Sequence, residues 1–109
     1  MQLMESIFDI ENLIKSNDMV LLYFSGTNCG VCRVIKPQVI ELLKKYPKIK
    51  SAEIELENHP EIAAQYNVFT LPSIIVFIDG KETIRKLRYM SLVDLESNFS
   101  RYYDLYYKE

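Results

Sequence analysis

The sequence contains little of what marks a loop-rich, fibrous or disulfide-stapled protein: it has three glycines, four prolines and two cysteines in 109 residues. So few glycines and prolines exclude a fibrous or loop-rich chain, and two cysteines are too few for a disulfide scaffold. The longest strongly apolar runs, residues 19–24 and 74–78, are too short to span a bilayer. Four acidic side chains lie within the first twenty residues, where a secretory signal needs a basic start and an unbroken apolar stretch. We therefore expect a cytoplasmic protein with no membrane partner.

A surplus of charge of one sign is also missing. Thirteen Lys and Arg residues stand against fifteen Asp and Glu residues, which gives a net charge of −2. Since nucleic-acid binding needs a basic face, we expect no nucleic-acid partner. Hydrophobic residues make up 49% and charged residues 26% of the chain, which is typical of a folded domain and not of a disordered segment. The length suits a single domain over residues 1–109.

Apolar periodicity predicts a chain in which helices and strands alternate. Residues 6–16 carry apolar side chains at helical spacing. The continuous apolar runs at residues 19–24 and 73–78 are typical of strands covered on both faces. The other expected elements are at most one short strand before residue 6, a helix from the cysteines to Pro47 that Pro37 should kink, a strand over 49–56, a short helix over 60–66, a strand near 82–87 and a final helix to about residue 107.

The order of these elements predicts the fold class. Asp79-Gly80 is a strong hairpin turn signal, so the last two strands should pair antiparallel. The earlier strands are joined by helices and should run parallel. The sequence therefore predicts an α/β fold with a central mixed β-sheet of four to five strands and helices on both faces.

The motif that carries chemistry is the CGVC sequence of residues 29–32, at the expected start of a helix that Thr27 or Asn28 should cap. A cysteine attacks as the thiolate, and free cysteine, with a pKa of about 8.5, is mostly protonated at neutral pH. The unpaired N–H groups and the dipole at a helix N-terminus stabilise the anion. We therefore expect Cys29 to be the exposed nucleophile. Cys32, one turn further on, is expected to resolve the mixed disulfide that Cys29 forms.

Two other uses of the cysteine pair stay open at this point. Two cysteines three apart are also half of a zinc or iron–sulfur site. Such a site needs four ligands, and the chain adds only His59, which we interpret as a surface or capping residue, so we expect no metal in one monomer. The pair could also be inert core cysteines, although the polar loop of residues 25–28 should hold Cys29 near the surface.

These features together resemble the thioredoxin family. The resemblance rests on a strand before CGVC, a helix with Pro37 five residues after Cys32, Thr70-Leu71-Pro72 ahead of a buried strand, and Asp79-Gly80. It covers the chain from Ser6 to about Phe99. It implies the thioredoxin fold and an enzyme that reduces disulfide-containing proteins through a redox-active Cys29–Cys32 disulfide. It further implies that no cofactor is bound and that a thioredoxin reductase supplies the electrons.

The resemblance also implies roles for residues beside the cysteines. Pro72 would be a cis-proline facing the two thiols, and the backbone of Leu71 would pair with an extended substrate segment. Gly30 and Val31 would belong to the same substrate-binding site. Pro72 could otherwise be an ordinary proline at the start of a strand.

The chain departs from the family where a proton acceptor is expected. The family usually has a buried Asp six residues before the nucleophile, and this chain has Tyr23 there. A tyrosine with a pKa near 10 is not a base at neutral pH. Glu53, on the adjacent expected strand, is the candidate proton acceptor for the resolving thiol; the alternative is a solvated strand residue.

Two further departures concern the substrate-binding site. Val31 replaces the proline of the family's motif and frees a backbone N–H near the thiols. We expect this N–H to stabilise the thiolate and to make the pair more oxidising. Arg88 replaces a glycine beside the substrate groove, where it would crowd the groove and favour acidic partners. The alternative is a shifted register that leaves Arg88 on the surface.

The final helix carries an aromatic stripe made of Phe99, Tyr102, Tyr103, Tyr106 and Tyr107. Their spacing puts them on one helix face, which is typical of a face packed on a core. We expect a monomer, with weak dimerisation through any part of the stripe that stays exposed.

Two other functions fit the sequence. A thioredoxin-fold binding or adaptor module with weak redox activity would explain why three residues usual in the family are missing near the cysteines: the Trp before the first cysteine, where this chain has Asn28, the Asp and the Pro. A glutaredoxin-like reductase that depends on a low-molecular-weight thiol would share the CxxC motif and the cis-proline. The helix before the first long strand and the position of Pro37 favour thioredoxin over glutaredoxin.

Overall fold

The computed structural model describes residues 1–107. Its strands are β1 (Gln2–Leu3), β2 (Met19–Ser25), β3 (Lys50–Glu55), β4 (Ser73–Ile78) and β5 (Lys81–Leu87). Its helices are α1 (Ile7–Ser16), α2 (Gly30–Leu43), α3 (Pro60–Gln65) and α4 (Leu92–Tyr107). Within these described residues, no helix is both long enough and apolar enough to cross a membrane.

Every expected helix and strand is present. The largest difference between predicted and observed bounds is at the end of α2. The prediction that this helix reaches Pro47 is wrong, since α2 ends at Leu43. Beyond that residue the N–H groups of Lys44, Lys45 and Tyr46 bond to carbonyls three residues back, which tightens the chain into a turn.

The strands form one mixed sheet in the order β1-β3-β2-β4-β5. β1 and β2 both run parallel to β3, whereas β4 runs antiparallel to β2 and β5 antiparallel to β4. The hairpin predicted at Asp79-Gly80 joins β4 to β5, and both residues have positive φ values, 53° and 77°. The expectation that helix-joined strands run parallel is wrong for β4. After β3 the chain passes through α3 without returning to the opposite end of the sheet, so β4 starts at the end where β3 finished and runs in the opposite direction. There Ser73 of β4 pairs with Phe24 of β2.

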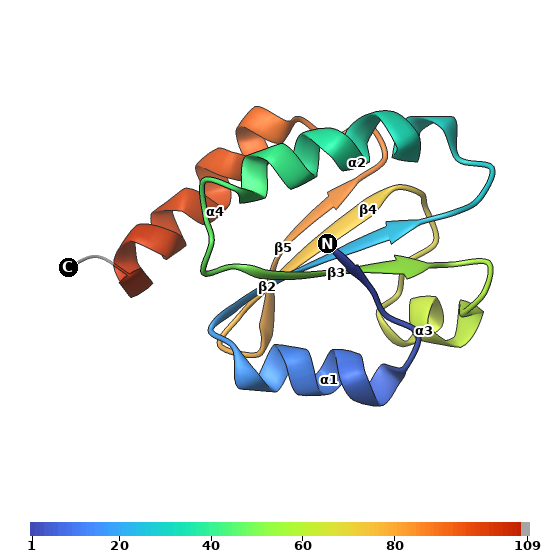
Figure 1. Ribbon diagram of the computed structural model, residues 1–109, viewed down its shortest axis with the longest axis horizontal. Coiled ribbons are helices and arrows are strands. Elements are labelled where there is room, and N and C mark those ends of the chain that lie inside the picture. Colours follow the sequence, from blue (N-terminus) through green and yellow to red (C-terminus); the bar gives the residue numbers. More distant parts are fainter. Residues whose placement is uncertain (108–109) are drawn as a thin grey trace.

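The sheet separates two apolar cores, with α1 and α3 on one face and α2 and α4 on the other (Figure 1). All seven residues of β2 are buried, as the continuous apolar run predicts. They alternate between the cores: Val20, Leu22 and Phe24 face α1 and α3, while Met19, Leu21 and Tyr23 face α2 and α4. Fully burying one large apolar side chain contributes about 1.5–3 kcal/mol. This alternation therefore fixes which residues of β2 lie under the cysteine-bearing helix.

The aromatic stripe of α4 lies mostly in the second core. The members that pack there are Phe99, Tyr103 and Tyr107, and the exposed members are Tyr102 and Tyr106. Tyr46, in the turn after α2, meets Phe99 and Tyr103 edge to face, with ring centroids 4.8 and 5.0 Å away. The stripe therefore fastens α4 to the end of α2, and dimerisation through its exposed part stays a prediction.

Candidate active site

The two cysteines lie at the junction between β2 and α2 and are joined in a disulfide, with their Cα atoms 5.2 Å apart. Cys29 is the N-cap residue of α2, and its sulfur accepts a hydrogen bond from the Cys32 N–H at 3.2 Å. Cys29 is half-buried, whereas Cys32 is only 4% exposed. The outer sulfur thus lies against an N–H group and the positive end of the helix dipole, an arrangement that stabilises a thiolate.

The loop between β2 and Cys29 is held by Glu57, from the segment that precedes α3. The Glu57 carboxylate accepts hydrogen bonds from both the N–H and the hydroxyl of Thr27. Arg33 donates to the Thr27 carbonyl at 3.0 Å. The prediction that Thr27 or Asn28 caps α2 is wrong: Thr27 is engaged by Glu57, and Cys29 occupies the N-cap position.

Gly26 lies at the tightest point of this loop. A Cβ atom there would lie 2.8 Å from Glu57 Oε1 and 2.8 Å from Leu71 Cδ1, so a side chain would push one of them away. Neither Gly26 nor Glu57 was predicted to be part of the site. Gly26 is one of only three glycines, which was a usable signal. Glu57 gave none, because its partner Thr27 is thirty residues away.

The peptide bond between Leu71 and Pro72 is cis. Pro72 is buried and stands directly before β4. Because Ser73 pairs with Phe24 near the end of β2, Pro72 lies at the end of the sheet from which the cysteine-bearing loop leaves. Leu71 reaches that loop at Gly26. The fold therefore brings the proline and the cysteine-bearing loop to one end of the sheet.

Glu53 is a buried carboxylate with partners on both oxygens. Its residue is 8% exposed, Ser25 donates to Oε2 at 2.8 Å, and Lys36 Nζ lies 2.6 Å from Oε1. The interpretation of Glu53 as a solvated strand residue is wrong, because the ion pair and the hydrogen bond offset the cost of burying its charge. Lys36 comes one turn after Cys32 on α2, so both project from the same side of that helix. Glu53 thus lies beneath the helix face that carries the inner cysteine.

Tyr23, which replaces the family's Asp, is fully buried beside Glu53 in the pairing of β2 with β3. Its hydroxyl donates a hydrogen bond to the Cys32 carbonyl at 2.9 Å. Burial, and next the charge of Glu53, raise the pKa of Tyr23 to about 12. Tyr23 is therefore neutral at physiological pH and ties β2 to the first turn of α2.

The remaining candidates surround the cysteines. Gly30 and Val31 form the first turn of α2, with Gly30 exposed and Val31 half-buried. Arg88 follows β5, whose last residue, Leu87, pairs with Ser73 of β4. The backbone of Arg88 is thus next in register to Pro72. Its side chain is exposed, with the guanidinium carbon 5.4 Å from the centre of the Tyr89 ring.

A metal site finds no support among the described residues. Over residues 1–107, no three His, Cys, Asp or Glu side chains group closely enough to hold a metal ion. His59 stands at the N-cap position of α3 without making a side-chain cap bond, and its Nδ1 lies 3.4 Å from Glu61 Oε1. It is half-buried and belongs to the start of this helix.

Comparison with known proteins identifies the family. The sequence model of the thioredoxin family matches residues 2–98. The thioredoxin-like protein YdfQ of Bacillus subtilis (strain 168) is 36% identical over 103 residues, which cover 94% of this chain and 92% of YdfQ. A thioredoxin of Mycoplasma genitalium is 27% identical over 96 residues, covering 85% of this chain and 94% of that protein.

Solved structures agree with the sequence comparison. The crystal structure of Fasciola hepatica thioredoxin superposes with a TM-score of 0.84 at 30% identity, covering 93% of this chain and 98% of that one. The expected thioredoxin fold is therefore confirmed, and the family typically binds no cofactor. The chain belongs to the thioredoxin family and is a disulfide reductase of that family, a thiol–disulfide oxidoreductase with a Cys29–Cys32 disulfide.

Proposed function

We propose that Cys29 attacks the disulfide of a partner protein and that Cys32 releases the product. The observation that carries this assignment is the difference between the two sulfurs: Cys29 is half-buried at the N-cap of α2, whereas Cys32 is 4% exposed one turn inside. A substrate therefore meets Cys29 first, and the same helix terminus stabilises its thiolate.

The reaction transfers two electrons to the substrate in two exchange steps. The Cys29 thiolate attacks one substrate sulfur; a mixed disulfide forms, the substrate S–S bond breaks, and the leaving thiolate takes a proton from solvent. Cys32 then loses its proton, and its thiolate attacks the Cys29 sulfur. The mixed disulfide breaks, the second substrate sulfur leaves as a thiolate, and the enzyme is left with the Cys29–Cys32 disulfide seen here.

We assign to Glu53 the role of accepting the proton of Cys32. Three observations support it: Glu53 is the buried carboxylate beneath α2, it pairs with Lys36 one turn after Cys32, and Tyr23 beside it is already bound to the Cys32 carbonyl. In relatives with the usual pattern the carboxylate stands on the strand before the cysteines, whereas here it stands on β3. From this position Glu53 would act as the general base either directly or through one water.

The substrate site is proposed at the end of the sheet where both Pro72 and the cysteine loop lie. The Leu71 backbone would pair with an extended substrate segment, and that segment would cross the cysteines and contact Gly30 and Val31. Arg88, next in register to Pro72, would contact the flank of that segment and favour acidic residues there.

Further proposals concern the setting of the reaction. A thioredoxin reductase would return two electrons to the disulfide after each cycle. A reducing cytoplasm suits an enzyme that must stay a dithiol between cycles. Residues 1–109 would act as one domain, which the single five-stranded sheet supports, and as a monomer.

Insulin reduction driven by dithiothreitol tests the proposal. The wild-type chain is expected to accelerate the reaction, and Cys29→Ser to abolish the acceleration. Cys32→Ser, reduced and freed of dithiothreitol before it is mixed with insulin, is expected to accumulate the mixed disulfide as a covalent adduct that added dithiothreitol removes. If neither substitution changed the rate, the chain would be a binding module with spectator cysteines. If acceleration required glutathione, the glutaredoxin-like alternative would replace this one.

A further inference from the structure

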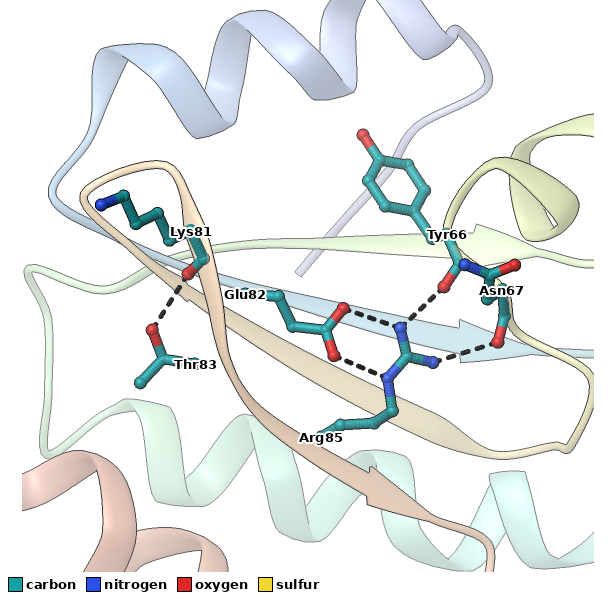
Figure 2. Close-up of polar contacts among 6 residues, drawn as sticks. All are labelled: Tyr66, Asn67, Lys81, Glu82, Thr83 and Arg85. Atoms are coloured by element: carbon teal, nitrogen blue, oxygen red, sulfur yellow. Dashed lines mark hydrogen bonds and ion pairs between the residues drawn. The ribbon is translucent and has the colours of Figure 1, made fainter.

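The segment that leads to Pro72 is fastened to strand β5 by one side chain. We call residues 66–72, between the end of α3 and β4, the proline segment. Arg85 of β5 donates from Nη2 to the Tyr66 carbonyl at 2.7 Å and from Nη1 to the Asn67 carbonyl at 3.1 Å. Figure 2 shows the guanidinium between these two carbonyls and the carboxylate of Glu82.

Glu82 fixes the direction of the guanidinium. Its carboxylate accepts from Arg85 Nε and Nη2, both at 2.8 Å, in a two-pronged pairing (Figure 2). This pairing raises the pKa of Arg85 and lowers the pKa of Glu82, so both stay charged across the physiological range. Such partly exposed pairs add little to global stability, but a two-pronged contact gives strong control of orientation.

The carbonyls that Arg85 binds lie where the chain turns out of α3. Asn67 has a φ of +56°, and the next residue, Val68, is buried with its N–H bonded to the Ala63 carbonyl at 2.8 Å. The last carbonyls of a helix have no partner within the helix, and Arg85 supplies one from another element. Since Arg85 pairs with Ile75 of β4, it reaches this turn from the face of the sheet that α3 covers.

The two ends of the proline segment are therefore held by different means. Its far end is fixed because Pro72 enters β4, which pairs along its length with β2. Its near end is held by Arg85 together with the burial of Val68 and the bond from the Val68 N–H to the Ala63 carbonyl. Between them the chain exposes Phe69, 80% accessible, and presents Leu71 to the cysteine loop.

We propose that Arg85 is a positioning residue for protein substrates, which holds the proline segment so that the Leu71 backbone stands ready to pair with an extended chain. This rests on the proposed function, in which Leu71 carries that pairing. The contacts of Arg85 go to Glu82 of its own strand and to the proline segment, and the cysteines are held separately by Glu57, Tyr23 and α2. Loss of Arg85 should therefore weaken the binding of substrates that need backbone pairing and spare the thiol chemistry.

The test compares two substrates that differ in backbone. Insulin offers an extended chain around its disulfide, whereas 5,5′-dithiobis(2-nitrobenzoic acid) is a disulfide without a peptide backbone. Arg85→Met is expected to raise the insulin KM about fivefold, because a misplaced docking group loses affinity, with kcat and the small-disulfide rate within about twofold. Arg85→Lys keeps the charge but loses the planar fork that binds both carbonyls and both Glu82 oxygens, so it should fall between wild type and Arg85→Met.

Two further variants control for charge and folding. Lys81→Met removes a positive charge from an exposed site on the same strand and should change neither KM nor kcat. Glu82→Gln keeps the guanidinium but weakens its orientation, so it should raise the insulin KM about twofold even if Arg85→Met does not fold. Hydrogen exchange at the Val68 amide should be faster in Arg85→Met, while exchange in β2 should not change.

The outcomes separate this proposal from the proposed function. An active wild type whose insulin KM does not change in Arg85→Met, or in Glu82→Gln where Arg85→Met does not fold, overturns the positioning role alone. An equal loss on both substrates also overturns it, since that marks general damage to the cysteine site. A wild type that reduces neither substrate overturns the proposed function and this role with it.

Discussion

The buried Tyr23 hydroxyl donates a hydrogen bond of 2.9 Å to the carbonyl of Cys32. At the position where the usual family pattern has an ionisable Asp, this chain thus has a neutral hydroxyl that donates a hydrogen bond to the backbone of α2. The acidic group stands one strand away, at Glu53.

Replacing Tyr23 by Phe should lower the free energy of unfolding by about 1–2 kcal/mol, because the Cys32 carbonyl loses a buried partner. Denaturant unfolding of the oxidised protein measures this change. Tyr102→Phe, on the exposed part of α4, serves as the matched control and should change the free energy of unfolding by less than about 0.5 kcal/mol. Equal effects in the two variants would contradict the importance of the buried bond.

The same substitution should change how stability depends on alkaline pH. The pKa of Tyr23 is raised from 10 in the unfolded chain to about 12 in the fold. Its contribution to stability is therefore complete below pH 10 and is lost as the pH rises through 12, by about 2–3 kcal/mol in total. Wild type should lose more stability than Tyr23→Phe between pH 10 and 12. Parallel curves for the two proteins would show that Tyr23 does not titrate as expected.

Glu53→Gln should slow resolution of the mixed disulfide by about tenfold or more at neutral pH, since the amide cannot accept the Cys32 proton. Single-turnover mixing of the reduced enzyme with insulin measures the resolving step. Glu55→Gln, on the same strand but half-buried, is the matched control and should leave that rate unchanged. An unchanged single-turnover rate in Glu53→Gln would remove Glu53 from the mechanism.

Val31→Pro should make the cysteine pair more reducing. The proline removes a backbone N–H from the first turn of α2, and a less stabilised thiolate favours the disulfide. We expect the reduction potential to fall by roughly 30 mV, which equilibration with glutathione buffers measures. A wild-type potential at or below that of the variant would contradict this interpretation of Val31.

Arg88→Gly should reduce the preference for acidic substrates. Disulfide peptides with Asp beside the cysteine should show a KM raised by about threefold in the variant, whereas matched peptides with Lys there should show no increase. The difference should shrink at high salt, as exposed charge interactions do. If both peptide series changed alike, Arg88 would affect the groove by its size and not by its charge.

The fold could be predicted from the sequence because its signals are local. The apolar run at residues 19–24 and the turn at Asp79-Gly80 each specify an element without reference to distant residues. The direction of β4 could not be predicted, because it depends on the end of the sheet at which the chain emerges from α3 and not on any pattern within β4.

The supporting contacts of the site could not be predicted in the same way. Glu53 looked like a solvated strand residue because its partner Lys36 lies on a different element. Thr27 was predicted to cap α2 because the sequence around it gives no sign that it binds Glu57, thirty residues away. Arg85 lies in a strand with four charged side chains, and only the folded chain shows that it binds the carbonyls at the end of α3. Pairings between distant segments determined each of these roles.

Strand β5 is an outer edge of the sheet, and its charges bear on aggregation. An open strand with free backbone groups invites pairing with a second molecule, and natural proteins discourage this with charged side chains at such borders. Here the border strand carries Lys81, Glu82, Arg85 and Lys86. Under the proposed function, substrate chains pair with the backbone at Leu71, and the charges of β5 would discourage the same kind of pairing along the longer free edge of the sheet.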